Sequence, residues 1–475
     1  MLTVGAMIGG AGCSFGDDEP ATVTVPRSNT STTTTTVDGS TQPDSVGPSP
    51  DSEPLPVAWI TQVGGPGDDH LRGVAGWDAE VIAVGDTAGL GGQPPLGNTD
   101  ALVVLASTGG EVRVTTALGS DGDDVANGVA ADLTSAACGT STGALASTNA
   151  GGTDAWCAQL DRSGQLVAPS QLGAADDESA TGIGTSPEIG TSYVSGTASG
   201  LLPGAQDPSG GQIGGGDALM MQVDEAGRPV WARQFGTGLL DSALGVSGVP
   251  DGDGVVVGFT DGDLEGPTNG GRDAFISRFD PSGNQRWVTQ IGSAGSDVLR
   301  CVTTTGEARR GDLRFAAAGS TDGDVDLDGP AVNAGMNDAL VASLAPNGAL
   351  SWITQFGSAA DESVSGVASD GATLYVVGST GDDFGDLIDG GGVGGGRDGF
   401  LAALDVASGS VLWVSRFGSA GDEEMTGLTV TEDGLLVASG TTSGQVGEAA
   451  SAGGLDGFLI AFPLSATGGG AASSV

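Results

Sequence analysis

Short segments in which apolar and polar residues alternate follow one another along most of this 475-residue chain. The segment Trp352-Ile-Thr-Gln-Phe-Gly has the two different faces of a strand, and further strands are predicted at 364–368, 374–378 and 399–404. Acidic or Gly-rich turns separate these segments, and no stretch shows the longer period of an amphipathic helix. The pattern therefore predicts an all-β protein.

One strand signature recurs along the chain. An Asp followed by a small residue and an apolar one opens a strand at Asp100, Asp154, Asp217, Asp273, Asp338, Asp398 and Asp456. These positions are 54 to 65 residues apart, which leaves room for four strands in each repeat. Seven such units predict a seven-bladed β-propeller of four-stranded antiparallel blades.

Turn chemistry indicates how the blades are connected. In Asp280-Pro-Ser-Gly283, Pro restricts φ and Gly permits a positive φ, as a hairpin turn requires. The Asp-type strand and the following Trp strand should therefore pair within one blade. Because no Trp strand follows Asp456 to Phe462, we expect the strand at Trp59 to complete that last blade and close the ring.

A small residue stands in register after each acidic turn. We assign these strands to the crowded centre of the ring, where bulk is excluded. The residues are Gly73, Gly128, Gly182, Gly245, Cys301, Gly366 and Gly427.

The repeat resembles the bacterial SBBP β-propeller repeat. The resemblance is carried by Trp287-Val-Thr-Gln-Ile-Gly, Gly319-Ser-Thr, Asp273-Ala-Phe-Ile and Asp280-Pro-Ser-Gly, and it covers residues 57 to about 464. Two repeats depart from it, with Val114 and Ala168 near the expected Trp. This resemblance implies the fold and a bacterial origin, and it implies no particular activity or catalytic residue.

The two ends of the chain differ in composition from the repeats. Residues 1–13 form a short apolar run that ends in small residues and Cys13, which predicts a lipoprotein signal with Cys13 as the lipidated residue. Residues 14–56 are rich in Thr, Ser and Pro and predict a disordered tether, the repeats form a propeller at 57–464, and residues 465–475 predict a disordered tail. This order predicts an extracytoplasmic protein that is lipid-anchored to the bacterial cell envelope, or secreted.

Charge narrows the range of partners. The chain has 60 acidic residues against 15 Arg and no Lys, a net charge of −45. Such a surface repels nucleic acid and anionic lipid headgroups, so we expect no nucleic-acid partner and membrane contact only through the lipid anchor. A monomer that binds a protein or a glycan through its loops is the expected form.

Two cysteines lie in neighbouring predicted strands. Cys138 ends one strand and Cys157 lies in the next, so antiparallel pairing could place them opposite each other. A disulfide between them is predicted outside the cytoplasm. The alternative is a pair of small buried residues.

Acidic residues suggest two further sites. The turns before the inner strands carry pairs such as Asp68-Asp69 and Asp422-Glu423, which could ring one mouth of the channel with carboxylates or could bond local backbone amides. The loop Asp324-Val-Asp326-Leu-Asp328-Gly resembles the start of an EF-hand loop. Asp324, Asp326 and Asp328 are therefore candidate Ca²⁺ ligands, and a solvated acidic loop is the alternative.

Signals for catalysis are few. The single His, His70, lies beside Arg72 in the first acidic turn, and Arg300 with Asp297 forms the equivalent pair in another repeat. We therefore expect no catalytic residues and no cofactor other than Ca²⁺, and we predict a non-enzymatic binding or scaffold module. The alternatives are a polysaccharide lyase or hydrolase acting at the channel mouth, and a structural component of an envelope complex.

Overall fold

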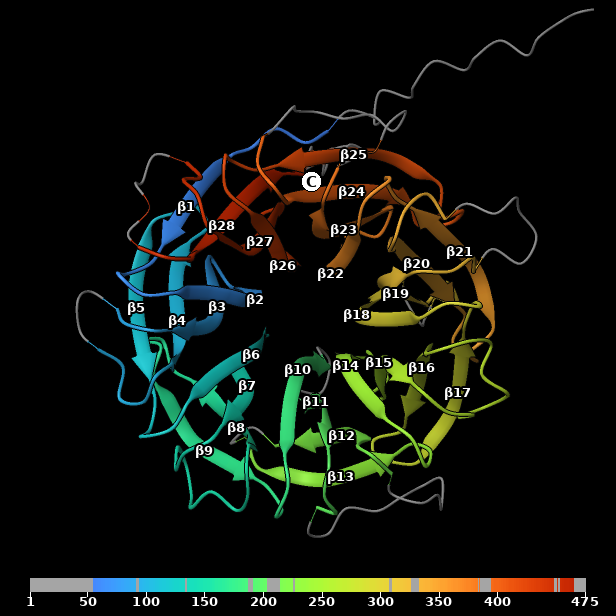
Figure 1. Cartoon of the computed structure of the whole chain (residues 1–475), viewed down its shortest axis with the longest axis horizontal. Helices are drawn as coiled ribbons and strands as arrows, with labels where there is room; N and C mark the ends of the chain where they lie inside the picture. The colour runs from blue at the N-terminus through green and yellow to red at the C-terminus, as the bar shows by residue number, and fades with distance from the viewer. Residues whose placement is uncertain are drawn as a thin grey trace, which may run out of the picture. The chain divides into compact units, whose positions relative to one another are not determined.

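The computed structural model describes residues 54–464 apart from 91–93, 133–134, 187–190, 203–213, 225–226, 307–309, 326–332, 383, 385–393, 448–450 and 452. The described residues form seven four-stranded antiparallel sheets and no helix. Figure 1 shows these sheets as the blades of a ring around a central axis. The predicted all-β seven-bladed propeller is therefore confirmed.

Each of the first six blades places its strands in chain order from the axis outward. Blade 1 contains β2 (Asp69–Trp77), β3 (Glu80–Thr87), β4 (Asp100–Ser107) and β5 (Val112–Leu118). Blade 2 contains β6 (Asp124–Ala131), β7 (Ser135–Ser141), β8 (Asp154–Leu160) and β9 (Leu166–Leu172). Blade 3 contains β10 (Glu178–Ser186), β11 (Thr191–Ala198), β12 (Asp217–Val223) and β13 (Pro229–Phe235).

The next three blades repeat this order. Blade 4 contains β14 (Asp241–Gly248), β15 (Gly254–Thr260), β16 (Asp273–Phe279) and β17 (Gln285–Ile291). Blade 5 contains β18 (Asp297–Thr305), β19 (Arg314–Thr321), β20 (Asp338–Leu344) and β21 (Leu350–Phe356). Blade 6 contains β22 (Glu362–Ser369), β23 (Thr373–Thr380), β24 (Asp398–Asp405) and β25 (Val411–Phe417).

Blade 7 closes the ring with strands from both ends of the repeat region. It contains β26 (Glu423–Val430), β27 (Leu435–Thr442), β28 (Asp456–Pro463) and, as its outermost strand, β1 (Trp59–Val63). Trp59 pairs with Ala461 and Val63 with Gly457, and β1 lies along β28 in Figure 1. The predicted closure is confirmed, and it leaves no blade with a missing strand.

The inner strands β2, β6, β10, β14, β18, β22 and β26 surround the axis, as predicted (Figure 1). A Cβ on Gly128 would lie 3.1 Å from the Cα of Gly182, and a Cβ on Gly427 would lie 3.2 Å from the Cα of Gly73. Larger side chains at these positions would clash with the next blade. Small residues there are therefore required by the packing at the axis.

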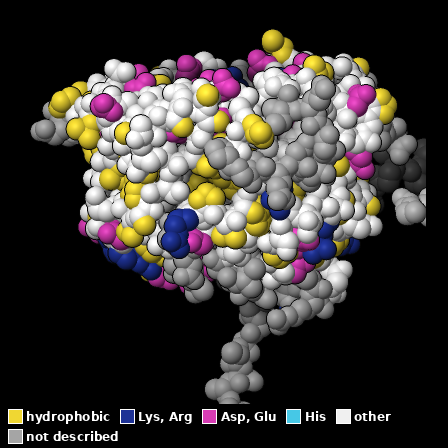
Figure 2. All heavy atoms as spheres, turned by 90° about the horizontal axis from the view of Figure 1, so that it is seen from below, with side chains coloured by type: hydrophobic (Ala, Val, Ile, Leu, Met, Phe, Trp, Pro, Cys, Tyr) yellow, Lys and Arg dark blue, Asp and Glu magenta, His cyan; other side chains and the backbone are white. Residues whose placement is uncertain are grey.

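The chain direction gives the ring two faces. The loop face carries the connections between the second and third strands of each blade and the turns that lead into the inner strands. The hairpin face carries the turns between first and second strands and between third and fourth strands. In Figure 2 most visible Arg side chains lie in the lower half, mixed with acidic ones, while the charged side chains visible in the upper half are mainly Asp and Glu.

Tryptophan side chains connect neighbouring blades by hydrogen bonds on the hairpin face, and each such contact is called a tryptophan latch. The Nε1 atom of Trp287 in blade 4 donates to the carbonyl oxygen of Pro346 in blade 5 at 2.9 Å, and Trp59 donates in the same way to Thr108 at 2.8 Å. A Cβ at Gly348, where φ is +86°, would collide with the Trp287 ring. The Trp strand and the Pro-x-Gly turn of the repeat thus form one inter-blade contact.

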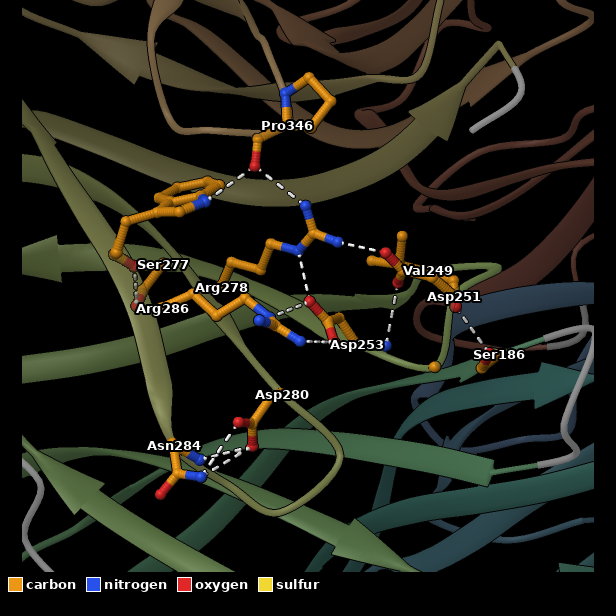
Figure 3. A network of polar contacts seen from close by, with 12 residues as sticks. Ser186, Val249, Asp251, Asp253, Ser277, Arg278, Asp280, Asn284, Arg286 and Pro346 are labelled. Atoms are coloured by element: carbon orange, nitrogen blue, oxygen red, sulfur yellow. Dashed lines mark hydrogen bonds and ion pairs between the residues drawn. The ribbon is translucent and has the colours of Figure 1, made fainter. Parts of the chain in front are cut away.

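A buried ion-pair network reinforces the hairpin face between blades 4 and 5 (Figure 3). Arg278 Nε donates to Asp253 Oδ2 at 2.7 Å, and its Nη1 donates to the carbonyl of Pro346 at 2.9 Å. The side chains of Arg278 and Asp253 are 8% and 1% exposed, and Arg286 also bonds Asp253. This carboxylate is therefore compensated by two guanidinium groups, as burial of a charge requires.

Candidate functional site

Every inner strand begins with a buried acidic side chain that organises the turn before it. The carboxylate of Asp69 accepts a hydrogen bond from the backbone N–H of Gly65, four residues earlier, at 2.6 Å. Asp124, Glu178, Asp241, Asp297, Glu362 and Glu423 do the same. These seven carboxylates therefore set turns, and they form no exposed ring at the channel mouth.

In five of the seven turns another acidic residue stands just before this position and ties two blades together. Asp68 Oδ1 accepts from the N–H of Leu455 at 3.0 Å, and Asp422 Oδ1 accepts from the N–H of Arg397 at 3.0 Å. Both donors lie in loops of the preceding blade. Of the two interpretations of the acidic turns, the one in which they bond backbone amides is confirmed.

Burial raises the pKa of most of the turn-setting acids. Desolvation raises the pKa of Asp69, Glu178, Asp241, Asp297 and Glu362 above the ordinary carboxyl value. For four of these acids a lesser contribution comes from the Asp that opens the third strand of the preceding blade, and for Asp241 it comes from Asp261. Both Asp338 Oδ1 and Glu362 Oε2 lie within 3 Å of the point where Gly357 would carry a Cβ. Carboxylates thus meet in pairs between blades.

A bulge in each inner strand turns an extra side chain toward the axis. The pairing of β2 with β3 shifts between Leu71 and Gly73, so Arg72 has no partner residue in β3. The other six inner strands shift at the equivalent point. The seven bulge residues line a central cavity of about 220 Å³, and they are Arg72, Asn127, Thr181, Leu244, Arg300, Ser365 and Thr426.

His70 and Arg72 converge on one buried carboxylate. His70 Nδ1 lies 3.0 Å from Asp86 Oδ2, and Arg72 Nε donates to Asp86 Oδ1 at 2.5 Å. Burial alone would raise the pKa of Asp86, but the hydrogen bond from His70 and the charge of Arg72 together hold it below its ordinary value. Asp86 is therefore an ionised anchor that orients both side chains.

These side chains line a cavity of about 270 Å³ at the channel mouth. It lies between blades 1 and 7, and a loop of blade 6 contributes to it. The lining side chains with polar or charged groups are His70, Arg72, Arg397, Asp422, Glu423, Glu424, Thr426 and Thr441. Groups of both signs beside an imidazole can bind a polar ligand, and an imidazole held by a carboxylate can also accept a proton.

The structure brings together only one of the two pairs noted in the sequence. Asp297 bonds the backbone and hydroxyl of Ser293, and no bond between Asp297 and Arg300 is found among the described residues. Arg397 and Glu424 line the mouth cavity, and the buried Asp86 holds two of its lining side chains, although sequence reasoning missed all three. The β2–β3 hairpin pairing could have indicated Asp86, but only with the bulge known.

The remaining predicted sites stay predictions. Cys13, Asp326 and Asp328 lie outside the described residues. Asp324 accepts a hydrogen bond from the N–H of Asn333 at 3.2 Å. Within the described ranges, no group of three or more His, Cys, Asp or Glu side chains could hold a metal ion.

The two cysteines predicted to form a disulfide pair directly across neighbouring strands. Cys138 is the register partner of Cys157, and both are buried free thiols. Burial raises the pKa of Cys157 to about 12 and raises that of Cys138 as well. The two positions are adjacent, as a disulfide requires, but the thiols are unbonded in this structure. The disulfide therefore stays a prediction.

Comparisons with known proteins add one curated relative. No protein-family model matches the chain. It is 26% identical over 420 residues to the regulatory protein FlaEY of Caulobacter vibrioides, a match that includes 76% of this chain and 42% of that protein. The chain thus spans less than half the length of this relative, and the resemblance to SBBP repeats stays a prediction.

Comparison with solved structures gives matches at low sequence identity. Hydrazine synthase of Kuenenia stuttgartiensis is 13% identical, over 80% of this chain and 93% of that chain, with a TM-score of 0.45. The endosialidase of phage phi92 is 11% identical, over 88% and 70%, with a TM-score of 0.45. BamB from Moraxella catarrhalis is 16% identical, over 84% and 99%, with a TM-score of 0.36.

In the part of the chain that the structure describes, no helix has the length and apolar character needed to cross a membrane.

Proposed function

We propose that this protein is a non-enzymatic binding or scaffold module of the bacterial cell envelope, held there by a lipid on Cys13, and that it recognises a protein or a glycan through its loop face. The observation that carries this proposal is the mouth cavity, in which His70, Arg72, Arg397 and Glu424 offer hydrogen-bond donors and acceptors of both charges. The relative from Caulobacter vibrioides is a regulatory protein, which is in keeping with a binding role.

Exposed apolar side chains on the loop face support a protein partner. Leu96, Leu201, Leu239 and Met336 are 54% to 73% exposed, and each lies in a loop-face connection. Single exposed apolar residues are common on proteins, but these surround the same face as the mouth cavity. A partner that covers the rim would bury them and also reach the cavity.

Capture experiments with matched variants test this proposal. The full chain would be used as bait on solubilised envelope membranes and on a glycan array. Leu201→Asp combined with Met336→Asp should abolish specific capture, whereas the control Val230→Asp with Leu350→Asp, on the hairpin side, should not. Equal capture by both variants would refute a loop-face site. A stable stoichiometric complex would favour a structural role in an envelope assembly.

The anchor needs its own test. Cys13→Ala should move the protein from the membrane fraction to the soluble fraction and prevent incorporation of labelled fatty acid. An unchanged distribution would contradict lipid anchoring at this residue.

A second candidate is a polysaccharide lyase or hydrolase at the channel mouth. The specific observation is that His70, which lines a cavity together with Glu424 and Arg397, is held from behind by the buried carboxylate of Asp86. A panel of polysaccharides would be incubated with the full chain and with His70→Gln. Turnover by the wild type that is lost in the variant would establish this alternative in place of the binding module.

A further inference from the structure

The central cavity has a charge opposite to that of the protein around it. Its lining contains Arg72 and Arg300 and, among the described residues, no Asp or Glu. The whole chain carries 60 acidic residues against 15 basic ones. Two arginines without a carboxylate in the same lining are therefore an exception to the composition of the chain. Asp86 compensates the charge of Arg72, so Arg300 supplies the uncompensated positive charge of this lining.

The bulge side chains around this cavity differ in whether they form hydrogen bonds to the next blade. Asn127 donates to the carbonyl of Ala180 in the next blade at 2.9 Å, and Thr181 donates to that of Ala243 at 2.7 Å. These contacts join the inner strands. Arg300 occupies the same structural position and is exposed, but within the described ranges it has no hydrogen bond or ion pair. Its guanidinium is thus available to a ligand.

The neighbouring strand explains why the two arginines differ. The β3 residue that holds Arg72 is Asp86, which pairs with His70 across the strands. In blade 5 the equivalent position is Ser320, the register partner of Val298, so Arg300 finds no carboxylate there. Arg72 uses its Nε on Asp86, and its side chain is still 41% exposed. Both guanidinium groups therefore have donors left for a further acceptor.

We propose that the central channel binds a small oxyanion, a carboxylate- or phosphate-bearing molecule, through Arg300 with Arg72 as the second cation. Guanidinium groups bind such anions through paired, charge-assisted hydrogen bonds. The hydroxyl of Ser365, which lines the same cavity in the blade next to Arg300, is a further donor. A volume of about 220 Å³ admits a molecule of the size of one sugar acid. This site goes beyond the proposed function and does not depend on loop-face binding.

Calorimetric titration of the full chain tests the site. Inorganic phosphate and glucuronate are the probes, and glucose is the uncharged control. We expect one or both anions to bind and glucose not to bind. Preference for phosphate or for glucuronate identifies which oxyanion the channel takes.

Two substitutions locate the binding. Arg300→Gln should weaken anion binding roughly ten-fold or more, since a charge-assisted hydrogen-bonded pair is lost. Arg300→Lys should retain part of the affinity, because lysine keeps the positive charge but cannot form the paired hydrogen bonds of the planar guanidinium. The control Arg228→Gln removes the same charge from an exposed pair with Asp224 and should leave binding unchanged.

Thermal melts would show that the variants are folded, which is expected because Arg300 makes no contact that the fold needs. Absence of anion binding by the wild type, equal binding of glucose, or unchanged affinity in Arg300→Gln would each overturn the proposal.

Discussion

The carboxylates on the two faces of the ring differ in burial and in the direction of their pKa shifts. On the loop face, Asp69 and Glu362 are buried, accept backbone amides, and have pKa values raised mainly by desolvation. On the hairpin face, the turn residue Asp161 is exposed and Asp405 is half-buried, and hydrogen bonds from Ser163 and Ser408 lower their pKa values. A carboxylic acid is thus harder to ionise in the loop-face turns and easier to ionise in the hairpin-face turns.

The faces also differ in how they join the blades. The loop face uses carboxylate-to-amide bonds at the blade junctions, with few cations nearby. The hairpin face uses tryptophan latches and arginine pairs, of which the Arg278 network is the most buried. We therefore expect the loop face to respond to pH and the hairpin face to respond to loss of individual charges or hydrogen bonds.

Opening the ring should have the largest effect, because both faces depend on closure. Deletion of residues 1–64 removes β1 and leaves β28 with an unpaired edge, so we expect aggregation and loss of a cooperative thermal transition. Deletion of residues 1–50 is the control and should leave the melting temperature unchanged. Equal melting of the two truncated proteins would mean that β1 does not hold the ring closed.

The next largest effect should come from the hairpin-face ion network. Asp253→Asn leaves the buried Arg278 without its main counter-charge, and loss of one partner of a buried pair costs about 3–5 kcal/mol. Denaturant unfolding would measure this free energy. The control is Asp224→Asn, whose pair with Arg228 is exposed to solvent, so its loss should change the free energy of unfolding much less. Similar losses in the two variants would contradict the importance of burial.

The loop face predicts a dependence of stability on pH. Because desolvation raises the pKa of the buried acids, the folded protein binds more protons than the unfolded one just above the ordinary carboxyl pKa. This stabilisation is complete below the ordinary pKa and is lost as pH rises through the raised values. The melting temperature should therefore be higher at pH 5 than at pH 7.

Further acidification should reverse this trend. Groups with lowered pKa values, such as Asp86 and Asp161, are stabilising only while ionised, and this stabilisation is lost as pH falls from the ordinary carboxyl pKa through their lowered values. The variant Glu362→Gln should reduce the difference between pH 5 and pH 7, because it removes one of the buried titrating groups. A melting temperature that falls steadily from pH 7 to pH 5 would show that the loop-face acids are ionised without cost.

The smallest effect concerns one latch on the hairpin face. The Thr289 hydroxyl donates to the carbonyl of Gly348 at 2.9 Å, so Thr289→Val should lower the free energy of unfolding by about 1 kcal/mol. Thr116 is the equivalent residue of blade 1, where Val114 replaces the latching Trp, and its hydroxyl has no hydrogen bond among the described residues. Thr116→Val should therefore be nearly neutral in the same denaturant titration.

The sequence by itself determined the blades and their order. Strand alternation, the Asp280-Pro-Ser-Gly turn and the missing Trp strand after Phe462 were enough to predict seven blades and closure by the strand at Trp59. These features depend on local backbone preferences and on a two-residue period, which are both visible along the chain. Small residues at the axis, such as Gly128, followed from the same repeat.

Only the tertiary structure decided what the acidic and basic residues do. The bulge after Leu71 shifts the pairing by one residue, which places His70 opposite Asp86 and leaves Arg72 at the axis. A regular hairpin would pair these residues differently and turn Asp86 to the other face of the sheet. The mouth cavity additionally joins Arg397 and Glu424 from distant repeats. Neither a one-residue shift in register nor a contact across the ring leaves a periodic mark in the sequence.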